Sequence, residues 1–300
     1  MSNVFVMASD KNLVVPLGVA AASLGRVVPS GTRLVIFEQG IDPTEQAWVK
    51  EQVPEGLSIE FVTVTEAMVF GVELPSHLPP ATLFRLMVGD LLPDEVTRVV
   101  YLDIDLLIRE DPSPLFDAPR GVLAAARDVY RPWVGGRPLN PWTELGVDPA
   151  APYFNAGVLA IDLPAWRSSG IADRCLDILR NHFLRYSDQD ALNLVLAGAW
   201  DEFDPRWNVQ SDAFVPQSLG WVALDNDVLQ AAVDDAAIVH FTGPDKPWST
   251  EPTTAYRREW YAALRATSRP DWHPDGPSSL QAGLKRVRRK IGRAIAGPQR

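Results

Sequence analysis

Short apolar runs bounded by turn residues recur along most of the chain, and segments with helical character stand between them. A short apolar run between turn signals is typical of a strand, and a longer run behind a capping residue is typical of a helix. Strands that alternate with helices need crossover connections, so the pattern predicts an α/β fold with a mostly parallel sheet. The predicted strands are residues 3–8, 34–37, 57–62, 121–126, 155–161 and 237–240. The predicted helices are 17–22, a segment that begins at Asp42, 82–92, 164–182 and 188–198.

The stretch from Val99 to Ile108 is an apolar run interrupted by two aspartates, Asp103 and Asp105. Side chains alternate along a strand, so the two carboxylates would point the same way and Ile104 the opposite way. Two carboxylates at the end of a buried strand repel each other and lose water, and a divalent cation relieves both effects. In open α/β sheets ligands bind outside the carboxyl ends of the strands, where this pair would lie. The alternative is that one aspartate caps a turn and the other is simply exposed.

The composition allows a large core, because 46% of the 300 residues are hydrophobic. α/β folds often use this length for one domain. The net charge of −10 argues against general nucleic-acid binding. The single cysteine, Cys175, cannot form an internal disulfide, which is compatible with a reducing compartment. The first residues lack the basic segment and long apolar run of a signal peptide, and no stretch approaches the roughly 18 apolar residues of a membrane span. We therefore expect a cytoplasmic protein.

The charge is unevenly distributed, because residues 281–300 contain seven basic side chains and no acidic one. Leu284, Val287, Ile291 and Ile295 recur there at helical spacing, with the basic residues on the remaining faces. This pattern is typical of a helix that lies on an anionic lipid surface, and the alternative is a disordered basic end. The chain therefore divides into a globular domain over residues 1–268 and a linker with a basic amphipathic tail over 269–300.

Polar clusters stand at the ends of several apolar elements, and their chemistry is complementary. Carboxylates with an imidazole suit a metal ion, arginine and lysine suit phosphates, and amides with acids suit sugar hydroxyls. This inventory fits a nucleoside diphosphate that carries a sugar. Neither a G-x-G-x-x-G fingerprint nor a Walker loop is present, so a nucleotide would be bound in another way. The clusters are Asp10 with Asn12, Arg85, Asp103 with Asp105, Asn155 with Asp188-Gln189-Asp190, and His240 with Lys246.

These clusters belong to six motifs that carry a resemblance to a known family. In order along the chain they are Ala8-Ser9-Asp10-Lys11-Asn12, Leu83-Phe84-Arg85-Leu86, Tyr101-Leu102-Asp103-Ile104-Asp105, Phe154-Asn155-Ala156-Gly157-Val158, the segment 187–193, and the segment 240–248. With this order and similar spacing, the chain resembles the family 8 retaining glycosyltransferases, which include bacterial lipopolysaccharide α-galactosyltransferases and glucosyltransferases and glycogenin.

The resemblance implies a GT-A type nucleotide-diphospho-sugar transferase fold, with a Rossmann-like mixed sheet and helices on both faces. Residues 1–268 would be the GT-A catalytic domain. The implied activity is metal-dependent, retaining transfer of galactose or glucose from a UDP-sugar to a glycan or glycolipid, in lipopolysaccharide or cell-surface polysaccharide synthesis. The alternative is a UDP-sugar-binding protein without transfer activity. A lipid-linked acceptor would place the protein at the inner face of the cell membrane.

The resemblance also assigns roles to residues. Mn²⁺, or Mg²⁺ in its place, would be held by Asp103, Asp105 and His240. The other residues of the donor site would be Ala8, Asp10, Asn12, Arg85, Ile104, Asn155, Asp188, Gln189, Gly243 and Lys246. Of these, Asp10 and Asn12 would meet uracil and ribose, and Lys246 with the Gly243 backbone would hold the diphosphate. Asp188 and Gln189 are the catalytic candidates.

Two mechanisms stay open for Asp188 and Gln189. One is a double displacement through either side chain, and the other is a same-face attack without an enzyme nucleophile. We favour the second, because glutamine is a poor nucleophile. A long loop over residues 127–152 carries Trp133 and Trp142 where an acceptor would enter, so either tryptophan is a candidate acceptor contact.

Overall fold

The computed structural model describes residues 2–65, 68, 80–136, 141–214, 225–243, 246–249 and 255–272. Residues 273–300 lie outside this set, and with them the amphipathic helix predicted over 284–295. The division of the chain at residue 268 therefore stays a prediction. None of the helices in the described ranges combines the length and the apolar character that a membrane crossing needs.

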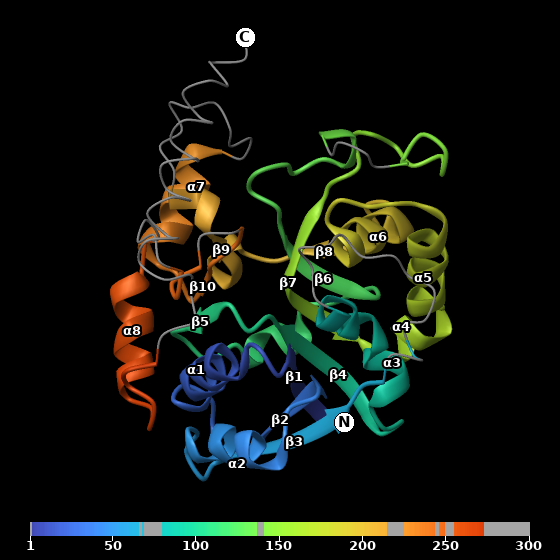
Figure 1. The fold of residues 1–300 in the computed structure, drawn as a ribbon. Helices are drawn as coiled ribbons and strands as arrows, with labels where there is room; N and C mark the ends of the chain where they lie inside the picture. Colours follow the sequence, from blue (N-terminus) through green and yellow to red (C-terminus); the bar gives the residue numbers. More distant parts are fainter. Residues whose placement is uncertain are drawn as a thin grey trace, which may run out of the picture.

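A seven-stranded mixed sheet forms the centre of the molecule, with strand order β3-β2-β1-β4-β7-β6-β8 (Figure 1). β1 is parallel to β2 and β4, and β2 is parallel to β3. β7 runs antiparallel to β4 and β6, and β8 is parallel to β6. The predicted mostly parallel sheet is confirmed. The strands are Ser2–Asp10 (β1), Thr32–Gln39 (β2), Leu57–Thr63 (β3), Val96–Leu102 (β4), Leu123–Arg127 (β6), Phe154–Asp162 (β7) and Asp201–Glu202 (β8).

A second, three-stranded sheet adjoins the first and has the order β5-β10-β9, formed by Leu106–Ile108 (β5), Ile238–His240 (β10) and Val209–Gln210 (β9). The prediction that the strand extends to Asp103 and Asp105 is wrong, because β4 ends at Leu102. The chain leaves the main sheet after Leu102 and turns through residues 103–105, and β5 then pairs antiparallel with β10. Two neighbouring carboxylates avoid the interior of a buried ladder, so the chain changes sheets at this point. The expected strand alternation therefore does not apply to Asp103 and Asp105, which both project from the turn.

The helices agree with the predictions at most positions. Asp42 caps α2 as expected, since its carboxylate accepts hydrogen bonds from the backbone N–H groups of Thr44 and Glu45. The helix predicted over 82–92 is instead a 3₁₀ helix over Pro80–Met87 followed by the short α3. The helix predicted over 164–182 is broken at Gly170, whose φ of +56° ends α4. The α-helices are Val14–Gly25 (α1), Pro43–Glu51 (α2), Val88–Leu91 (α3), Leu163–Ser168 (α4), Ile171–Asn181 (α5), Ser187–Leu196 (α6), Asn226–Asp234 (α7) and Arg257–Arg265 (α8).

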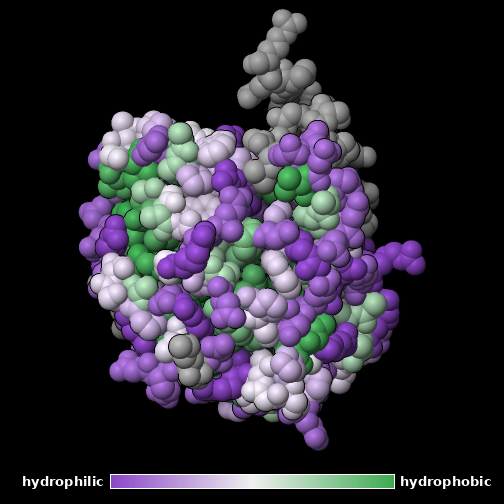
Figure 2. Space-filling model, turned by 180° about the vertical axis from the view of Figure 1, so that it is seen from behind, coloured by the Kyte–Doolittle hydropathy of each residue, from purple (hydrophilic) through white to green (hydrophobic). Residues whose placement is uncertain are grey.

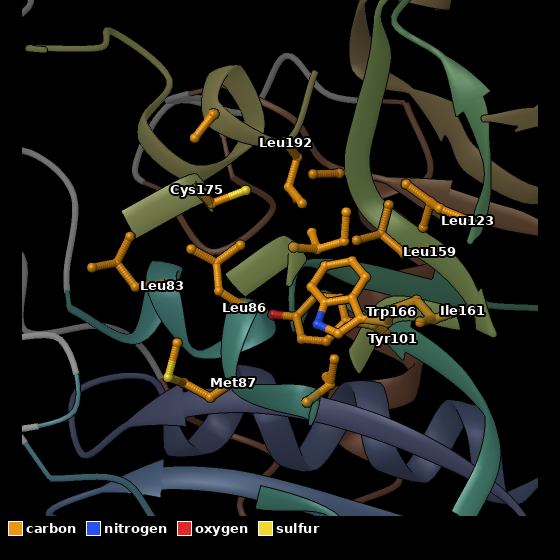
Figure 3. Close-up of a cluster of buried hydrophobic side chains, with 14 of the residues drawn as sticks. Leu83, Leu86, Met87, Tyr101, Leu123, Leu159, Ile161, Trp166, Cys175 and Leu192 are labelled. Carbon is orange, nitrogen blue, oxygen red and sulfur yellow. The ribbon is translucent and has the colours of Figure 1, made fainter. Parts of the chain in front are cut away.

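Both faces of the main sheet are buried, because the side chains of β1 alternate between two apolar cores. Val4 and Val6 lie in the core that also holds Trp166 and residues of α5 and α6, shown in Figure 3. Phe5 and Met7 lie in the core formed with α1, α2 and α8. Helices therefore cover both faces, as predicted. Seen from behind, the surface is mostly hydrophilic, with apolar side chains in separate patches (Figure 2).

Candidate active site

Three potential metal ligands converge where the two sheets meet. Asp103 and Asp105 come from the turn between β4 and β5, and His240 is the last residue of β10. One ligand atom from each lies within 4.8 Å of the others. His240 Nε2 is 3.2 Å from Asp105 Oδ1 and 3.9 Å from Asp103 Oδ2. Two carboxylates with one imidazole nitrogen are a donor set that suits a hard-to-borderline divalent cation such as Mn²⁺ or Mg²⁺.

Lys246 completes this region, which we call the metal corner (Asp103, Asp105, His240 and Lys246). The Lys246 ammonium contacts Asp105 Oδ2 and donates to the carbonyl of Phe241 at 2.7 Å. Burial alone would raise the pKa of the Asp105 carboxyl, but Lys246 and His240 outweigh that effect and hold this pKa well below its usual range. The Asp105 carboxylate is therefore favoured in its charged form, between Lys246 and His240.

Arg85 joins the metal corner to a second group of side chains. Its Nη2 lies 2.9 Å from Asp103 Oδ1, and its Nε lies 2.7 Å from Asp188 Oδ2. Its Nη1 donates to the carbonyl of Ala156, and the guanidinium stacks 4.8 Å above the ring of Tyr101. Burial disfavours the charged guanidinium, but the two carboxylates outweigh burial and raise the pKa of Arg85 above its usual value.

Asp188 and Gln189 start α6 and face Arg85 and β7. Ser187 precedes them with a left-handed φ of +44°, a conformation that turns the chain sharply into the helix. Burial raises the pKa of Asp188 to about 7; the charge of Arg85 opposes this shift and that of Asp103 adds to it.

Gln189 is held by three hydrogen bonds. Its Oε1 accepts from the backbone N–H of Ala156 at 3.0 Å. Its Nε2 donates to Asp128 Oδ2 and to the hydroxyl of Tyr153, both at 3.3 Å. We call Arg85, Asp188, Gln189, Asp128 and Tyr153 the sugar-side cluster. Both ends of the Gln189 side-chain amide, its oxygen and its NH₂ group, are therefore oriented before any ligand binds.

Asn155 and Gly157 connect β7 to the metal corner. Asn155 Oδ1 accepts from the Gly157 N–H and from Asn208 Nδ2, each at 3.0 Å. The Gly157 carbonyl accepts from the Asp103 N–H at 2.8 Å, so that the turn after β4 stays attached to β7. This pairing places the predicted Asn155 beside the predicted metal ligands.

The remaining predicted residues lie around this network without a described side-chain contact to it. Asp10 ends β1, the neighbour of β4, and its Oδ1 accepts from the Asn12 N–H at 2.8 Å in an Asx turn. Ala8 is buried in β1, and Ile104 is buried between the two aspartates. Gly243 has a φ of +74° in the segment after β10, three positions before Lys246. Asp10 and Asn12 therefore line the carboxyl end of the strand next to the metal corner.

Four residues of the network were not predicted as site residues: Asp128, Tyr153, Asn208 and Tyr101. Asp128 follows β6 directly, so the signal that identified the other clusters, a polar residue after an apolar strand, applied to it as well. Asn208 ends a 3₁₀ helix over Pro205–Asn208 in a segment without an apolar period, and it carried no such signal.

Comparison with known proteins identifies relatives over most of the chain. Residues 4–251 match the family model described as Glycosyl transferase family 8. General stress protein A of Bacillus subtilis (strain 168) is 32% identical over 257 residues, which cover 83% of this chain and 86% of that protein. Lipopolysaccharide 1,3-galactosyltransferase of Salmonella typhimurium (strain LT2) is 28% identical over 255 residues, 80% of this chain and 71% of that protein.

Solved structures agree with the fold. The crystal structure of the galactosyltransferase LgtC in complex with donor and acceptor sugar analogs superimposes with a TM-score of 0.74 at 27% identity, and the match covers 94% of this chain and 99% of that one. An active-site mutant of LgtC gives a TM-score of 0.75 at 25% identity, over 93% of this chain and 99% of that chain.

Proposed function

The chain belongs to glycosyl transferase family 8, and we propose that it transfers galactose or glucose from a UDP-sugar to a glycan or glycolipid, with retention at the anomeric carbon. The observation that carries this proposal is the continuity between a metal-ligand triad and a buried arginine–aspartate pair, through the contact of Arg85 with Asp103. A donor with a diphosphate at one end and a hexose at the other needs both parts side by side. The relatives named as lipopolysaccharide galactosyl- and glucosyltransferases support the choice of hexose.

The metal corner would hold the diphosphate end of the donor. Asp103, Asp105 and His240 would hold Mn²⁺ or Mg²⁺, and a divalent cation supplies positive charge to a departing diphosphate. Lys246 would add a second positive charge there, and the backbone of Gly243 would contact the phosphates. The end of β1 would hold the nucleoside, with Asp10 and Asn12 toward uracil and ribose, beside Ala8 and Ile104.

The sugar-side cluster would hold the hexose. Arg85, Asn155 and Gln189 would bind its hydroxyls, and Asp188 would stabilise the positive charge that grows at the anomeric carbon as UDP leaves. The Gln189 carbonyl is already hydrogen-bonded to a backbone amide, which makes it a weaker nucleophile still. This supports an attack of the acceptor from the face that UDP leaves, without an enzyme nucleophile. Trp133 is 43% exposed in the loop before β7 and is a candidate contact for the acceptor.

UDP release from a panel of donors tests this function. The full chain would be incubated with UDP-galactose, UDP-glucose, UDP-N-acetylglucosamine and UDP-glucuronate, in Mn²⁺ or in EDTA. We expect metal-dependent release that is fastest from UDP-galactose or UDP-glucose. Release that persists in EDTA would contradict the proposal. If the chain binds UDP tightly but releases no UDP from any donor, even with soluble and lipid-linked glycan acceptors supplied, the alternative of a UDP-sugar-binding protein would be favoured.

The acceptor and the place of action extend the proposal. A lipid-linked glycan would be met at the inner face of the cell membrane by a cytoplasmic protein, with the basic segment 281–300 against anionic lipid. In the same assay, a chain that ends at residue 272 should lose activity on a glycolipid in anionic vesicles and keep activity on a soluble glycan. Equal activity on the vesicle acceptor would count against the membrane role.

A further inference from the structure

The imidazole of His240 has two different environments at its two nitrogens. Nε2 faces Asp103 and Asp105, as described above. Nδ1 lies 2.8 Å from Asn208 Oδ1, on the side away from the carboxylates. His240 and Asn208 are both almost completely buried, at 4% and 0% exposure, so this contact is shielded from bulk solvent.

The hydrogen-bond chain behind His240 fixes which atom donates at each step. The Gly157 N–H can only donate, so the Asn155 atom that it contacts must be the amide oxygen. The Asn208 atom that contacts the same oxygen must then be its NH₂ group. The oxygen of Asn208 is therefore the atom that faces His240. An amide oxygen only accepts, so Nδ1 of His240 carries a proton. Asp105 Oδ1 also only accepts, so Nε2 carries a proton as well when the imidazole is charged. In the neutral imidazole, which is the form that binds a cation, Nδ1 keeps its proton and the lone pair is on Nε2.

Gly157 also fixes the position of the ring. A Cβ at residue 157 would lie 2.1 Å from Cε1 and 2.6 Å from Nδ1 of His240, so the imidazole rests directly on the glycine. Any larger residue would displace the ring from this position. The carbonyl of the same glycine accepts the hydrogen bond from the Asp103 N–H, and the glycine thereby sets the positions of two of the three metal ligands.

We propose that Asn208 is a positioning residue for the metal site, which holds His240 in its Nδ1–H tautomer with Nε2 directed at Asp103 and Asp105, and that Asn155 in turn orients Asn208. The claim that Asn208 supports metal binding rests on the proposed function. The claim about the tautomer of His240 does not depend on that function. Partners of a metal-binding histidine typically contribute about 10- to 100-fold to metal affinity.

The tautomer is tested first, on the metal-free full chain at a pH at which the imidazole of His240 is neutral. ¹⁵N NMR of the imidazole nitrogens distinguishes the two tautomers, and His240→Gln identifies the His240 signals among the four histidines. We expect the Nδ1–H form in the unaltered chain and its loss in Asn208→Leu, which has a similar volume and no acceptor. An Nε2–H form in the unaltered chain would overturn the proposal, whatever the enzyme does with UDP-sugars.

Metal affinity is tested next, by titration of the full chain with Mn²⁺ while the free ion is measured by EPR. Asn208→Leu should bind Mn²⁺ about 10- to 100-fold more weakly. Asn208→Asp should stay within about threefold of the unaltered chain, because it keeps an acceptor for Nδ1–H. It should nevertheless melt at a lower temperature, because its carboxylate would face Asn155 Oδ1.

A second buried asparagine serves as the matched control. Asn193 binds both backbone groups of Phe154 and does not contact the histidine, so Asn193→Leu should lower the melting temperature and leave the Mn²⁺ affinity unchanged. Unchanged Mn²⁺ affinity in a folded Asn208→Leu variant would overturn the positioning role. The positioning role would also be overturned if the Mn²⁺ affinities of all three variants simply followed their melting temperatures.

Discussion

The metal corner and the sugar-side cluster differ in how their charges are balanced. In the metal corner two carboxylates and the Nε2 atom of His240 face one another, and each carboxylate contacts one cationic side chain, Asp103 with Arg85 and Asp105 with Lys246. In the sugar-side cluster Arg85 neutralises Asp188, and both ends of the Gln189 amide are paired within the protein. The metal corner would be completed by a bound cation, whereas the side chains of the sugar-side cluster are already held by hydrogen bonds and ion pairs within the protein. Preorganised dipoles need no rearrangement when charge develops on a sugar, whereas an exchangeable cation needs carboxylate and imidazole atoms that face one another around a common point.

The largest effect is expected when the metal corner alone is disrupted. Asp105→Asn removes the carboxylate that lies between His240 and Lys246, so metal-dependent UDP release should fall on the order of 10³-fold. Asp177→Asn, on the exposed side of α5, is the control and should keep full activity. Circular dichroism should show both variants folded. Substantial metal-dependent UDP release by Asp105→Asn would contradict the larger contribution to activity that is expected of the metal corner.

A smaller effect is expected when the sugar-side cluster alone is disrupted. Asp188→Asn keeps the volume and removes the charge beside Arg85, so kcat should fall about 10²-fold because the developing positive charge loses its partner. Mn²⁺ affinity should stay that of the unaltered chain, since Asp188 does not contact the metal corner directly. A near-normal kcat would exclude Asp188 from the mechanism, and a weakened Mn²⁺ affinity would show that the two regions are not separable.

The smallest effect concerns the response of stability to pH. Asp188 has a pKa of about 7 in the folded chain against 3.8 for an unperturbed aspartate, so the folded state binds the extra proton between these values. Its stabilising contribution is complete below the lower value and is lost as the pH rises through 7. The free energy of unfolding in EDTA should therefore fall with rising pH by up to about 1 kcal/mol per unit. Urea denaturation from pH 5 to 8 should show this slope, and Asp188→Asn should flatten it. An equal slope in both proteins would contradict the raised pKa.

The sequence was informative at several positions where a polar residue follows an apolar strand, although Asp128, which follows β6 in the same way, was missed. Asp10, Asp103 and His240 each stand where a ladder ends, and a side chain that ends a buried strand points to the edge where ligands bind. The motifs around them also predicted the family, and this prediction is confirmed. The predicted α/β fold with a mixed sheet is confirmed by the strand order and by the agreement with LgtC.

Other features were not readable from the sequence for physical reasons. The exchange of sheets between β4 and β5 uses the same apolar residue types on both sides, so the sequence gives no sign that the first strand ends before Asp103 and that a strand of another sheet follows. β8 and β9 have only two residues each, too few for a period. Asn208 and Tyr153 act through hydrogen bonds to residues far away in the sequence, and such pairings exist only once the fold has formed.

The junction between the two sheets has a consequence for folding as well as for chemistry. Asp105 and His240 are separated by well over a hundred residues of chain, and Cys175 has no second cysteine to pair with. A cation held between them would close that long loop in the way a disulfide does, and would restrict the unfolded chain. The donor-site ion would then be a reversible cross-link, which stabilises the fold only while the ion is bound and the enzyme is competent for transfer.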